Sequence, residues 1–169
     1  MNTLEAIHTR RSVRSFMNKP VPMELLDELV RAAMCAPSAG NQQPWQFVIV
    51  DDRILLNGVM EVTPNAKMCK EARAAILVCG DTKKEKYPGF WVQDCSAATE
   101  NLLLAAHERG LGAVWTGIYP IAERVEGFRG LFELPEHVIP LCLVPIGYPA
   151  KAAALVDRFQ AERVHHNKW

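Results

Sequence analysis

The sequence has no long apolar run, no excess of either charge and no obvious leader segment. No apolar stretch approaches the roughly 18 residues that a bilayer-spanning helix needs, and the first residues lack the basic and apolar regions of a signal peptide. Nineteen Lys and Arg side chains balance nineteen Asp and Glu side chains. These features predict a cytoplasmic protein without a membrane segment.

Paired cysteine and histidine motifs are also scarce. The five cysteines are odd in number, and none lies in a C-x-x-C pair. This pattern favours reduced core thiols over a disulfide framework or a zinc site. Adjacent side chains in an extended segment point in opposite directions, so His165 and His166 predict no metal site. The cysteines are Cys35, Cys69, Cys79, Cys95 and Cys142.

A dinucleotide-binding fingerprint is missing from the chain. Gly110-Leu111-Gly112 follows a predicted helix and precedes a predicted strand, whereas the Rossmann motif needs a strand before it and a helix after it. Gly110 is therefore expected to cap the helix. The zero net charge and the lack of alternating basic and aromatic residues argue against a nucleic-acid binder.

What remains is the composition of an ordinary globular protein. Its 169 residues predict one domain spanning residues 1–169. With 49% hydrophobic and 22% charged residues, the chain is neither disordered nor collagen-like. Residues 1–20 hold four basic side chains against one acidic, and residues 158–169 hold three against one. These basic ends could meet on one small anion, or they could be solvated termini.

Apolar periodicity and turn residues predict alternating helices and strands. Residues 91–109 are apolar on almost every face, which indicates a helix buried in the core or at a subunit interface. Pro145 predicts an edge or a bulge for the last strand. The tail from residue 147 ends in Trp169, so we expect it to pack on another surface. Helices are predicted at 2–10, from 22 to before 37, at 53–72 with an interruption at Pro64, at 91–109 and at 122–132, and strands at 45–50, 76–79, 113–116 and 141–146.

Two polar segments carry the chemistry. Residues 10–14 follow the first predicted helix and offer guanidinium groups and a hydroxyl, which are good donors to a phosphate. Residues 37–45 precede the first predicted strand and offer Ser, Asn and Gln side chains to a heterocycle or a polyol. Taken alone, the first could be a solvated basic turn and the second an ordinary loop.

These segments and two later ones resemble the nitroreductase family of flavin-dependent oxidoreductases, in its short single-domain form. The resemblance covers essentially the whole chain in the expected order. It consists of R-R-S-V-R-x-F from residue 10, P-S-A-x-N-x-Q-P-W from residue 37, G-L-G-A-V-W-T-G-I at 110–118, P-I-G-Y-P at 145–149 and the following Arg158-Phe159.

The resemblance implies a bound FMN. Arg10, Ser12 and Arg14 match residues that hold the FMN phosphate and the polar edge of the flavin, with Arg11 as a helper. Arg158 matches a phosphate ligand near the C-terminus. The basic ends of the chain would then share one function.

The same resemblance implies the surroundings of the flavin ring. Thr116 and Gly117 match a segment that places a backbone N–H near flavin N5, and Asn65 matches a residue that bonds the pyrimidine edge. Met68 stands where related proteins often have a Lys, so the charge near that edge differs. The loop that a second subunit lays against the flavin is matched by Pro37, Ser38, Ala39 and Asn41.

The implied fold is α+β, with a central mixed, largely antiparallel sheet of four to five strands flanked by helices, in an intertwined homodimer. The implied activity is hydride transfer from NAD(P)H through flavin N5 to a nitroaromatic, a quinone or a similar acceptor, in two half-reactions at one site. No side chain needs to act as a general base, and none is predicted to be catalytic.

Two alternatives stay open within this fold. A reductive dehalogenase or a flavin-consuming enzyme would need a segment that orders its substrate, for which residues 83–91 form the candidate lid. A non-catalytic FMN carrier or sensor would bind the flavin with the same residues.

Overall fold

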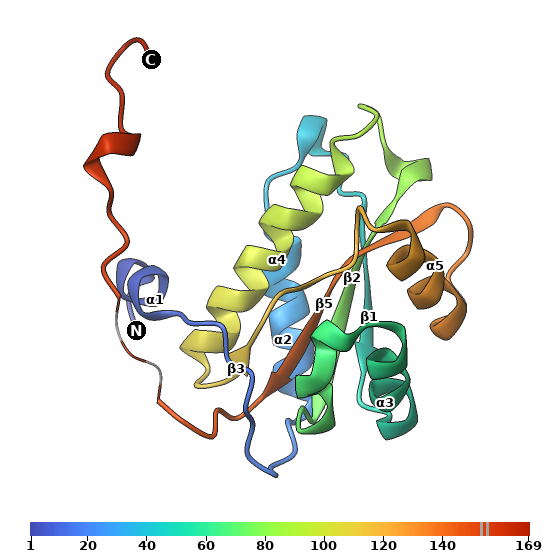
Figure 1. The fold of residues 1–169 in the computed structure, drawn as a ribbon. Coiled ribbons are helices and arrows are strands. Elements are labelled where there is room, and N and C mark those ends of the chain that lie inside the picture. The colour runs from blue at the N-terminus through green and yellow to red at the C-terminus, as the bar shows by residue number, and fades with distance from the viewer. Residues whose placement is uncertain (153, 155) are drawn as a thin grey trace.

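A five-stranded sheet lies between two helical layers in the computed structural model, which describes residues 1–152, 154 and 156–169 (Figure 1). The order is β1-β2-β5-β3, and β4 pairs with β5 as well. All four strand pairs are antiparallel, and the isolated Ser12–Ala113 bridge is parallel. The predicted α+β fold is therefore confirmed. The strands are β1 Trp45–Val50, β2 Ala74–Asp81, β3 Gly112–Ala113, β4 Thr116–Gly117 and β5 Val138–Gly147.

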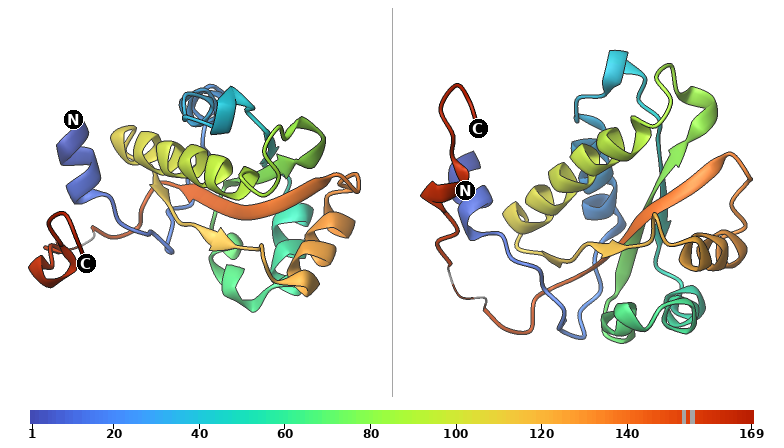
Figure 2. Two further views of the ribbon diagram at one scale, coloured as in Figure 1. Left: turned by 90° about the horizontal axis from the view of Figure 1, so that it is seen from above. Right: turned by 45° about the horizontal axis from the view of Figure 1, so that its top comes forward.

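Helices cover both faces of the sheet (Figure 2). On one face lie α2 (Met23–Met34) and α4 (Trp91–Glu108), and on the other lie α3 (Arg53–Val62), the 3-10 helix η2 (Pro64–Lys70) and α5 (Ala122–Leu131). The short α1 (Thr3–Thr9) packs against α4. In the described part of the chain, no helix is long and apolar enough to cross a membrane.

β2 runs through the middle of this core. All eight of its residues are buried. Because successive side chains of a strand point to opposite faces, Ile76 and Val78 pack towards α2 and α4, while Leu77 and Cys79 pack towards α3 and α5. Burial on both faces explains why this strand is a continuous apolar run in the sequence.

Local sequence signals set most helix boundaries. Asn2 and Glu5 form a capping box at the start of α1. Pro22 is the N-cap of α2 and not its first helical residue, because its ψ of 143° is extended. Pro64 separates α3 from η2, as predicted. Gly110 takes the positive φ of 71° expected of a residue that follows a helix.

The predicted strand at 113–116 is interrupted. β3 and β4 pair with β5 in one continuous register, with Ala113 opposite Ile146 and Thr116 opposite Leu143. The gap between them faces Val144 and Pro145. Since proline has no N–H to donate, the ladder breaks there.

Of the two alternatives predicted for the last strand, an edge or a bulge, the edge is wrong. β5 lies inside the sheet, with β2 on one side and β3 and β4 on the other. A register shift does occur in β5, but near Pro140, because Val78 pairs with Cys142 and Cys79 pairs with Pro140. The prolines of β5 leave the strand without two N–H donors. Pairing with β3 and β4 is interrupted opposite Pro145, and pairing with β2 has a bulge near Pro140.

Two glycines let residues 10–16 lie directly against the sheet. A Cβ on Gly112 would lie 2.6 Å from Cγ1 of Val13, and a Cβ on Gly147 would lie 2.9 Å from Cδ1 of Phe16. The N–H of Val13 donates to the carbonyl of Ala113 at 3.0 Å. The basic segment therefore has a fixed path along the sheet edge.

The C-terminal tail runs beside α1, away from the sheet (Figures 1 and 2). Arg11 contacts it, donating to the carbonyl oxygens of Ala154 at 3.0 Å and Val156 at 3.3 Å. Phe159 is 75% exposed and Trp169 is fully exposed. The expected packing of the tail is therefore not found among the described residues of a single chain, whose core is already closed without these side chains.

Candidate functional site

A cleft of about 310 Å³ opens beside β4. Three elements wall it: the basic segment at 10–16, η2 and the first turn of α5. Four of the residues implied to bind a cofactor meet here, although they are up to 103 positions apart in the sequence: Arg14, Asn65, Thr116 and Gly117. The remaining lining residues are Met68, Val114, Trp115 and Arg124.

Glu71 joins two walls of this cleft. Its carboxylate accepts hydrogen bonds from the N–H of Phe16 at 2.9 Å and the hydroxyl of Ser15 at 3.1 Å. These bonds lower the pKa of Glu71, because they stabilise its charged form. The residue after η2 thus holds the segment that carries Arg14.

Hydrogen bonds from Arg53 anchor the C-terminal end of η2. Its guanidinium donates to the carbonyl oxygens of Cys69 at 2.8 Å, Lys70 at 3.0 Å and Ala72 at 2.5 Å. The carbonyls of Cys69 and Lys70 belong to the last turn of η2, which leaves them without a partner inside the helix. The turn that presents Asn65 and Met68 is therefore anchored at its far end.

The cleft offers unused polar groups. The hydroxyl of Thr116 is buried and has no hydrogen-bond partner within residues 1–152, 154 and 156–169. Arg14 and Arg124 bring two positive charges, and no carboxylate is among the described residues that line the cleft. A heterocycle that carries hydrogen-bond acceptors fits this set, because the two guanidinium groups are donors and a buried hydroxyl without a partner is costly.

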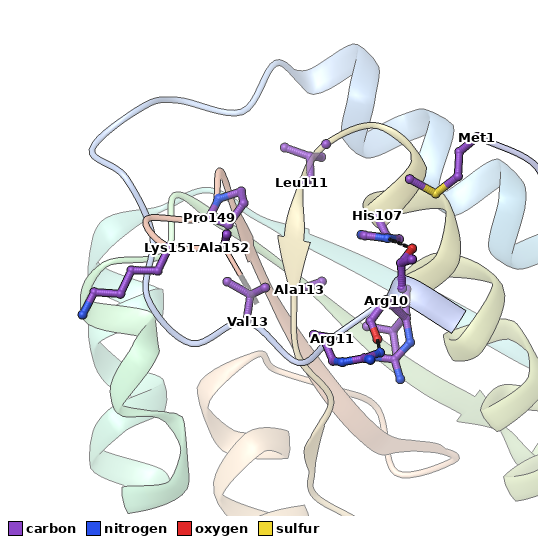
Figure 3. A pocket seen from close by; sticks show the side chains of 13 residues that line it. Met1, Arg10, Arg11, Val13, His107, Leu111, Ala113, Pro149, Lys151 and Ala152 are labelled. Carbon is purple, nitrogen blue, oxygen red and sulfur yellow. Dashed lines mark hydrogen bonds between the residues drawn. The ribbon is translucent and has the colours of Figure 1, made fainter. Parts of the chain in front are cut away.

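Three of the residues that the resemblance implies for the phosphate line a second groove. Arg10, Arg11 and Arg158 line a groove of about 570 Å³ between α1 and the tail. Residues of both basic ends therefore line one groove, and binding of one anion there stays a prediction. Arg10 and Arg11 also line a pocket of about 370 Å³ that Val13, His107 and Leu111 share (Figure 3). Ser12 is exposed and lines none of these cavities.

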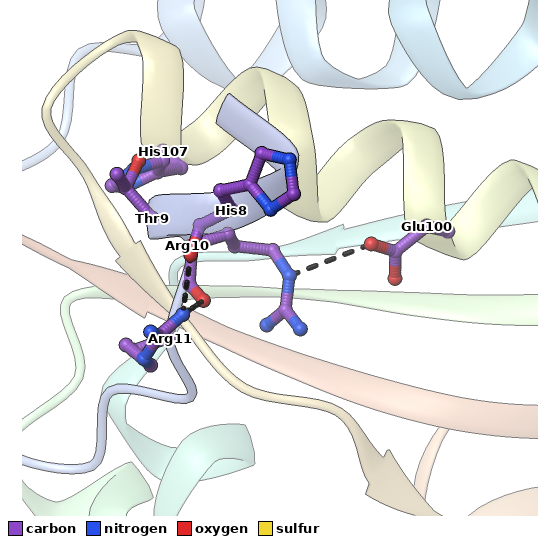
Figure 4. A network of polar contacts seen from close by, with 6 residues as sticks. All are labelled: His8, Thr9, Arg10, Arg11, Glu100 and His107. Carbon is purple, nitrogen blue, oxygen red and sulfur yellow. Dashed lines mark hydrogen bonds and ion pairs between the residues drawn. The ribbon is translucent and has the colours of Figure 1, made fainter. Parts of the chain in front are cut away.

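A polar network fixes the arginines of this region (Figure 4). Nε of Arg10 lies 3.4 Å from Oε1 of Glu100, and Nη1 of Arg11 donates to the carbonyl of Arg10 at 2.7 Å. Oγ1 of Thr9 lies 2.7 Å from Nε2 of His107. Burial, with the nearby charges of Arg10 and Arg11, lowers the pKa of His107. The neutral form of the imidazole is therefore favoured beside the guanidinium groups.

The polar loop before β1 lies elsewhere. The carboxylate of Asp94, near the start of α4, accepts from the N–H of Ala39 at 2.9 Å and from Nε2 of Gln42 at 2.6 Å. The oxygen of Gln42 accepts from the backbone N–H groups of Lys86 at 2.8 Å and Tyr87 at 3.2 Å. One chain thus does not bring its own Pro37, Ser38, Ala39 and Asn41 to the cleft.

Sequence reasoning missed three residues that organise the cleft and the loop before β1: Asp94, Glu71 and Arg124. Asp94 and Glu71 show no local signal except a carboxylate beside apolar residues. Arg124 does carry a signal, because it lies in the first turn of α5, where the helix dipole disfavours a cation. Its Nη1 donates to the carbonyl of Gly117 at 3.0 Å.

The model of the nitroreductase family matches residues 7–148. The chain belongs to the nitroreductase family. Over all 169 residues it is 54% identical to a protein of Methanothermobacter thermautotrophicus that is provisionally named NADH dehydrogenase/NAD(P)H nitroreductase, and it covers 88% of that protein. It is also 28% identical to an iodotyrosine deiodinase of Haliscomenobacter hydrossis, with 88% of this chain and 79% of the relative covered.

Solved structures agree with the family assignment. A crystal structure from Parabacteroides distasonis, provisionally named in the same way, has a TM-score of 0.96 at 47% identity and covers the whole of both chains. A nitroreductase-like protein from Desulfovibrio desulfuricans, solved in complex with FMN, has a TM-score of 0.86 at 28% identity and covers 100% of this chain and 99% of the other. The predicted family and fold are confirmed.

Proposed function

We propose that this member of the nitroreductase family passes hydride from NAD(P)H through FMN to an electron-poor acceptor, such as a nitroaromatic or a quinone. As a nitroreductase it is an FMN-dependent NAD(P)H oxidoreductase. The observation that carries the proposal is the cleft in which Arg14, Asn65, Thr116 and Gly117 converge. The FMN complex of the Desulfovibrio relative supports the identity of the cofactor.

The residues of the cleft suit the ring of FMN, which supplies hydride chemistry at N5 when it is bound. Arg14 and Asn65 would bind the polar edge of the ring, and the hydroxyl of Thr116 would gain the partner that it lacks among the described residues. The backbone of Gly117 is held by Arg124. For the phosphate, Arg10, Arg11, Ser12 and Arg158 are the proposed ligands.

The second subunit is part of the proposal. The loop with Ala39 and Asn41 is rigidly tied to α4 but does not reach the cleft of its own chain. Phe159 and Trp169 in the tail are exposed. Both features support an intertwined homodimer in which each subunit lays this loop on the flavin of the other. Sedimentation of the flavin-loaded protein should give about twice 18.9 kDa, and a flavin-loaded monomer would contradict the homodimer.

The decisive experiment follows the flavin through both half-reactions. The purified protein should be yellow after addition of FMN and gel filtration, and NADH or NADPH should bleach it without oxygen. A quinone or a nitroaromatic should then restore the colour, with many turnovers in a steady-state assay. A flavin that NAD(P)H bleaches only stoichiometrically, with no turnover, would make the protein a carrier or sensor.

Reductive dehalogenation is the second candidate, and the similarity to an iodotyrosine deiodinase favours it. The candidate lid carries Tyr87 and Phe90, which are exposed and contact each other edge to face with ring centroids 6.3 Å apart. Halide release from a halogenated tyrosine, measured with a chemically reduced flavin, tests this reaction. Fast quinone reduction without halide release would favour the first candidate.

A further inference from the structure

Arg124 occupies a position that helix stability does not explain. It is the third residue of α5, where the N-terminal end of the helix dipole repels a cation. Its side chain is half-buried and turns back to β4, where Nη1 donates to the carbonyl of Gly117 at 3.0 Å. The side chain of Arg124 therefore lines the cleft.

The charge of Arg124 is uncompensated. Among the described residues, no carboxylate forms an ion pair with Arg124 or Arg14, and none lines the cleft. Arg129, one turn and a half further along the same helix, behaves differently, because it pairs with Glu126. The cleft thus combines two guanidinium groups that have no carboxylate partner among the described residues with the positive end of a helix.

A positive cleft favours one redox state of a flavin over the other. In the reduction step the C–H bond of the dihydronicotinamide breaks, and its proton and two electrons pass to N5 of FMN. The nicotinamide leaves as a cation, and the flavin ring gains one negative charge. A fixed positive charge nearby stabilises the ring after this transfer more than before it.

We propose that Arg124 sets the reduction potential of the bound flavin, by adding to Arg14 the second positive charge of the cleft while it holds the Gly117 carbonyl in place. This role rests on the proposed function. Arg124 is a positioning residue for the backbone beside Thr116 and an electrostatic partner of the reduced ring. Met68 supplies no charge on the η2 side, so the charge comes from α5.

The test compares three variants of the FMN-loaded protein. Arg124→Gln removes the charge and keeps a donor, Arg124→Lys keeps the charge, and Arg129→Gln is the matched control. Arg129 lies on the same helix and also donates to a backbone carbonyl, that of Glu136 at 3.3 Å, but it does not line the cleft. The measurements are the dissociation constants of oxidised and reduced FMN and the two-electron midpoint potential.

Arg124→Gln should weaken the binding of reduced FMN about tenfold relative to oxidised FMN, which lowers the midpoint potential by about 30 mV. Arg124→Lys should restore most of that potential, and Arg129→Gln should leave it unchanged. A purely structural Arg124 would weaken both redox forms equally and leave the potential unchanged in Arg124→Gln, which would overturn the inference. Failure of Arg124→Lys to restore the potential would overturn it too.

These outcomes separate the inference from the proposed function. A wild-type protein that binds no FMN would contradict both the proposed function and the role of Arg124. A wild-type protein that binds FMN and is bleached by NAD(P)H, but whose potential does not depend on the charge at position 124, would remove the inference alone.

Discussion

Gln42 donates its Nε2–H to the carboxylate of Asp94 at 2.6 Å, and both side chains are more than nine-tenths buried. The same carboxylate accepts the N–H of Ala39 at 2.9 Å. A buried charge is tolerated when donors surround it. The polar loop before β1 is thus attached to α4 by its backbone and by a side chain.

Asp94→Asn should lower the free energy of unfolding by about 1.5–3 kcal/mol, because the substitution weakens a hydrogen bond to a charged group and places a new donor against two others. Urea unfolding followed by tryptophan fluorescence measures the change. The exposed Asp51→Asn is the matched control. A change within 0.5 kcal/mol, roughly that of an ordinary surface substitution, would show that the loop needs no charge at this position.

The boundaries of β1 could be predicted from the sequence, whereas the anchoring of the preceding loop could not. Aromatic and β-branched residues between Pro44 and Asp51 specify the strand locally, and its ends are found as predicted. Asp94 is 52 positions from Gln42, and nothing in the local pattern of α4 distinguishes it from a solvated carboxylate. Local residue preferences determine the strand, whereas packing between distant segments determines how the loop is anchored.

The candidate site likewise combines residues that the sequence could predict with one that it could not. Motif resemblance predicts Arg14, Asn65, Thr116 and Gly117 as cofactor-binding residues, and the structure brings these four into one cleft. It could not identify Arg124, whose importance depends on the path of its side chain back to β4. The interruption between β3 and β4 was missed for a similar reason, since Pro145 acts across the sheet from another strand.

Arg14→Ala should weaken FMN binding about 10- to 150-fold, because a lost charge-assisted hydrogen bond is worth about 1.5–3 kcal/mol. Titration of the apoprotein with FMN, followed by flavin fluorescence, gives the dissociation constant. Arg73→Ala, at an exposed position outside the cleft, should leave it unchanged. An unchanged affinity in Arg14→Ala would remove this residue from the site.

Arg158→Ala should also raise the FMN dissociation constant, because Arg158 shares a groove with Arg10 and Arg11 and would approach the same phosphate. Arg163→Ala is the control within the same tail. Limited proteolysis should cleave residues 156–169 faster in the apoprotein than in the FMN-loaded protein. Equal cleavage together with a normal affinity of Arg158→Ala would mean that the N-terminal arginines hold the phosphate alone.

Glu71→Gln should change how the stability of the fold depends on pH. The pKa of Glu71 is lowered in the folded protein, so its bonds to Phe16 and Ser15 stabilise the fold fully above about pH 4.3, the ordinary glutamate value. That contribution is lost as the pH falls through the lowered pKa. The difference in thermal midpoint between wild type and variant should therefore be largest at neutral pH and shrink below pH ~4. A constant difference across this range would mean that ionisation of Glu71 does not matter.

Thiol reactivity should single out Cys35, the one exposed cysteine. Burial raises the pKa of Cys69 to about 11 and those of Cys79 and Cys142 to about 12, and it also raises the pKa of Cys95. A disulfide reagent at pH ~8 should therefore label one thiol in the native protein and five after unfolding. Cys35→Ser should abolish the fast native reaction. Rapid labelling of a second thiol would reveal opening of the core.

The spacing of contacts along α4 limits how this protein can vary. Asp94 holds the loop before β1, Glu100 pairs with Arg10, and His107 contacts Thr9, so two distant segments are attached at three points along a single helix of 18 residues, roughly 27 Å long. One residue inserted between Asp94 and His107 would rotate one half of the helix against the other by about 100° and separate these contacts. Substitutions on the exposed face of α4 are compatible with the fold, whereas changes of length must fall in the loops.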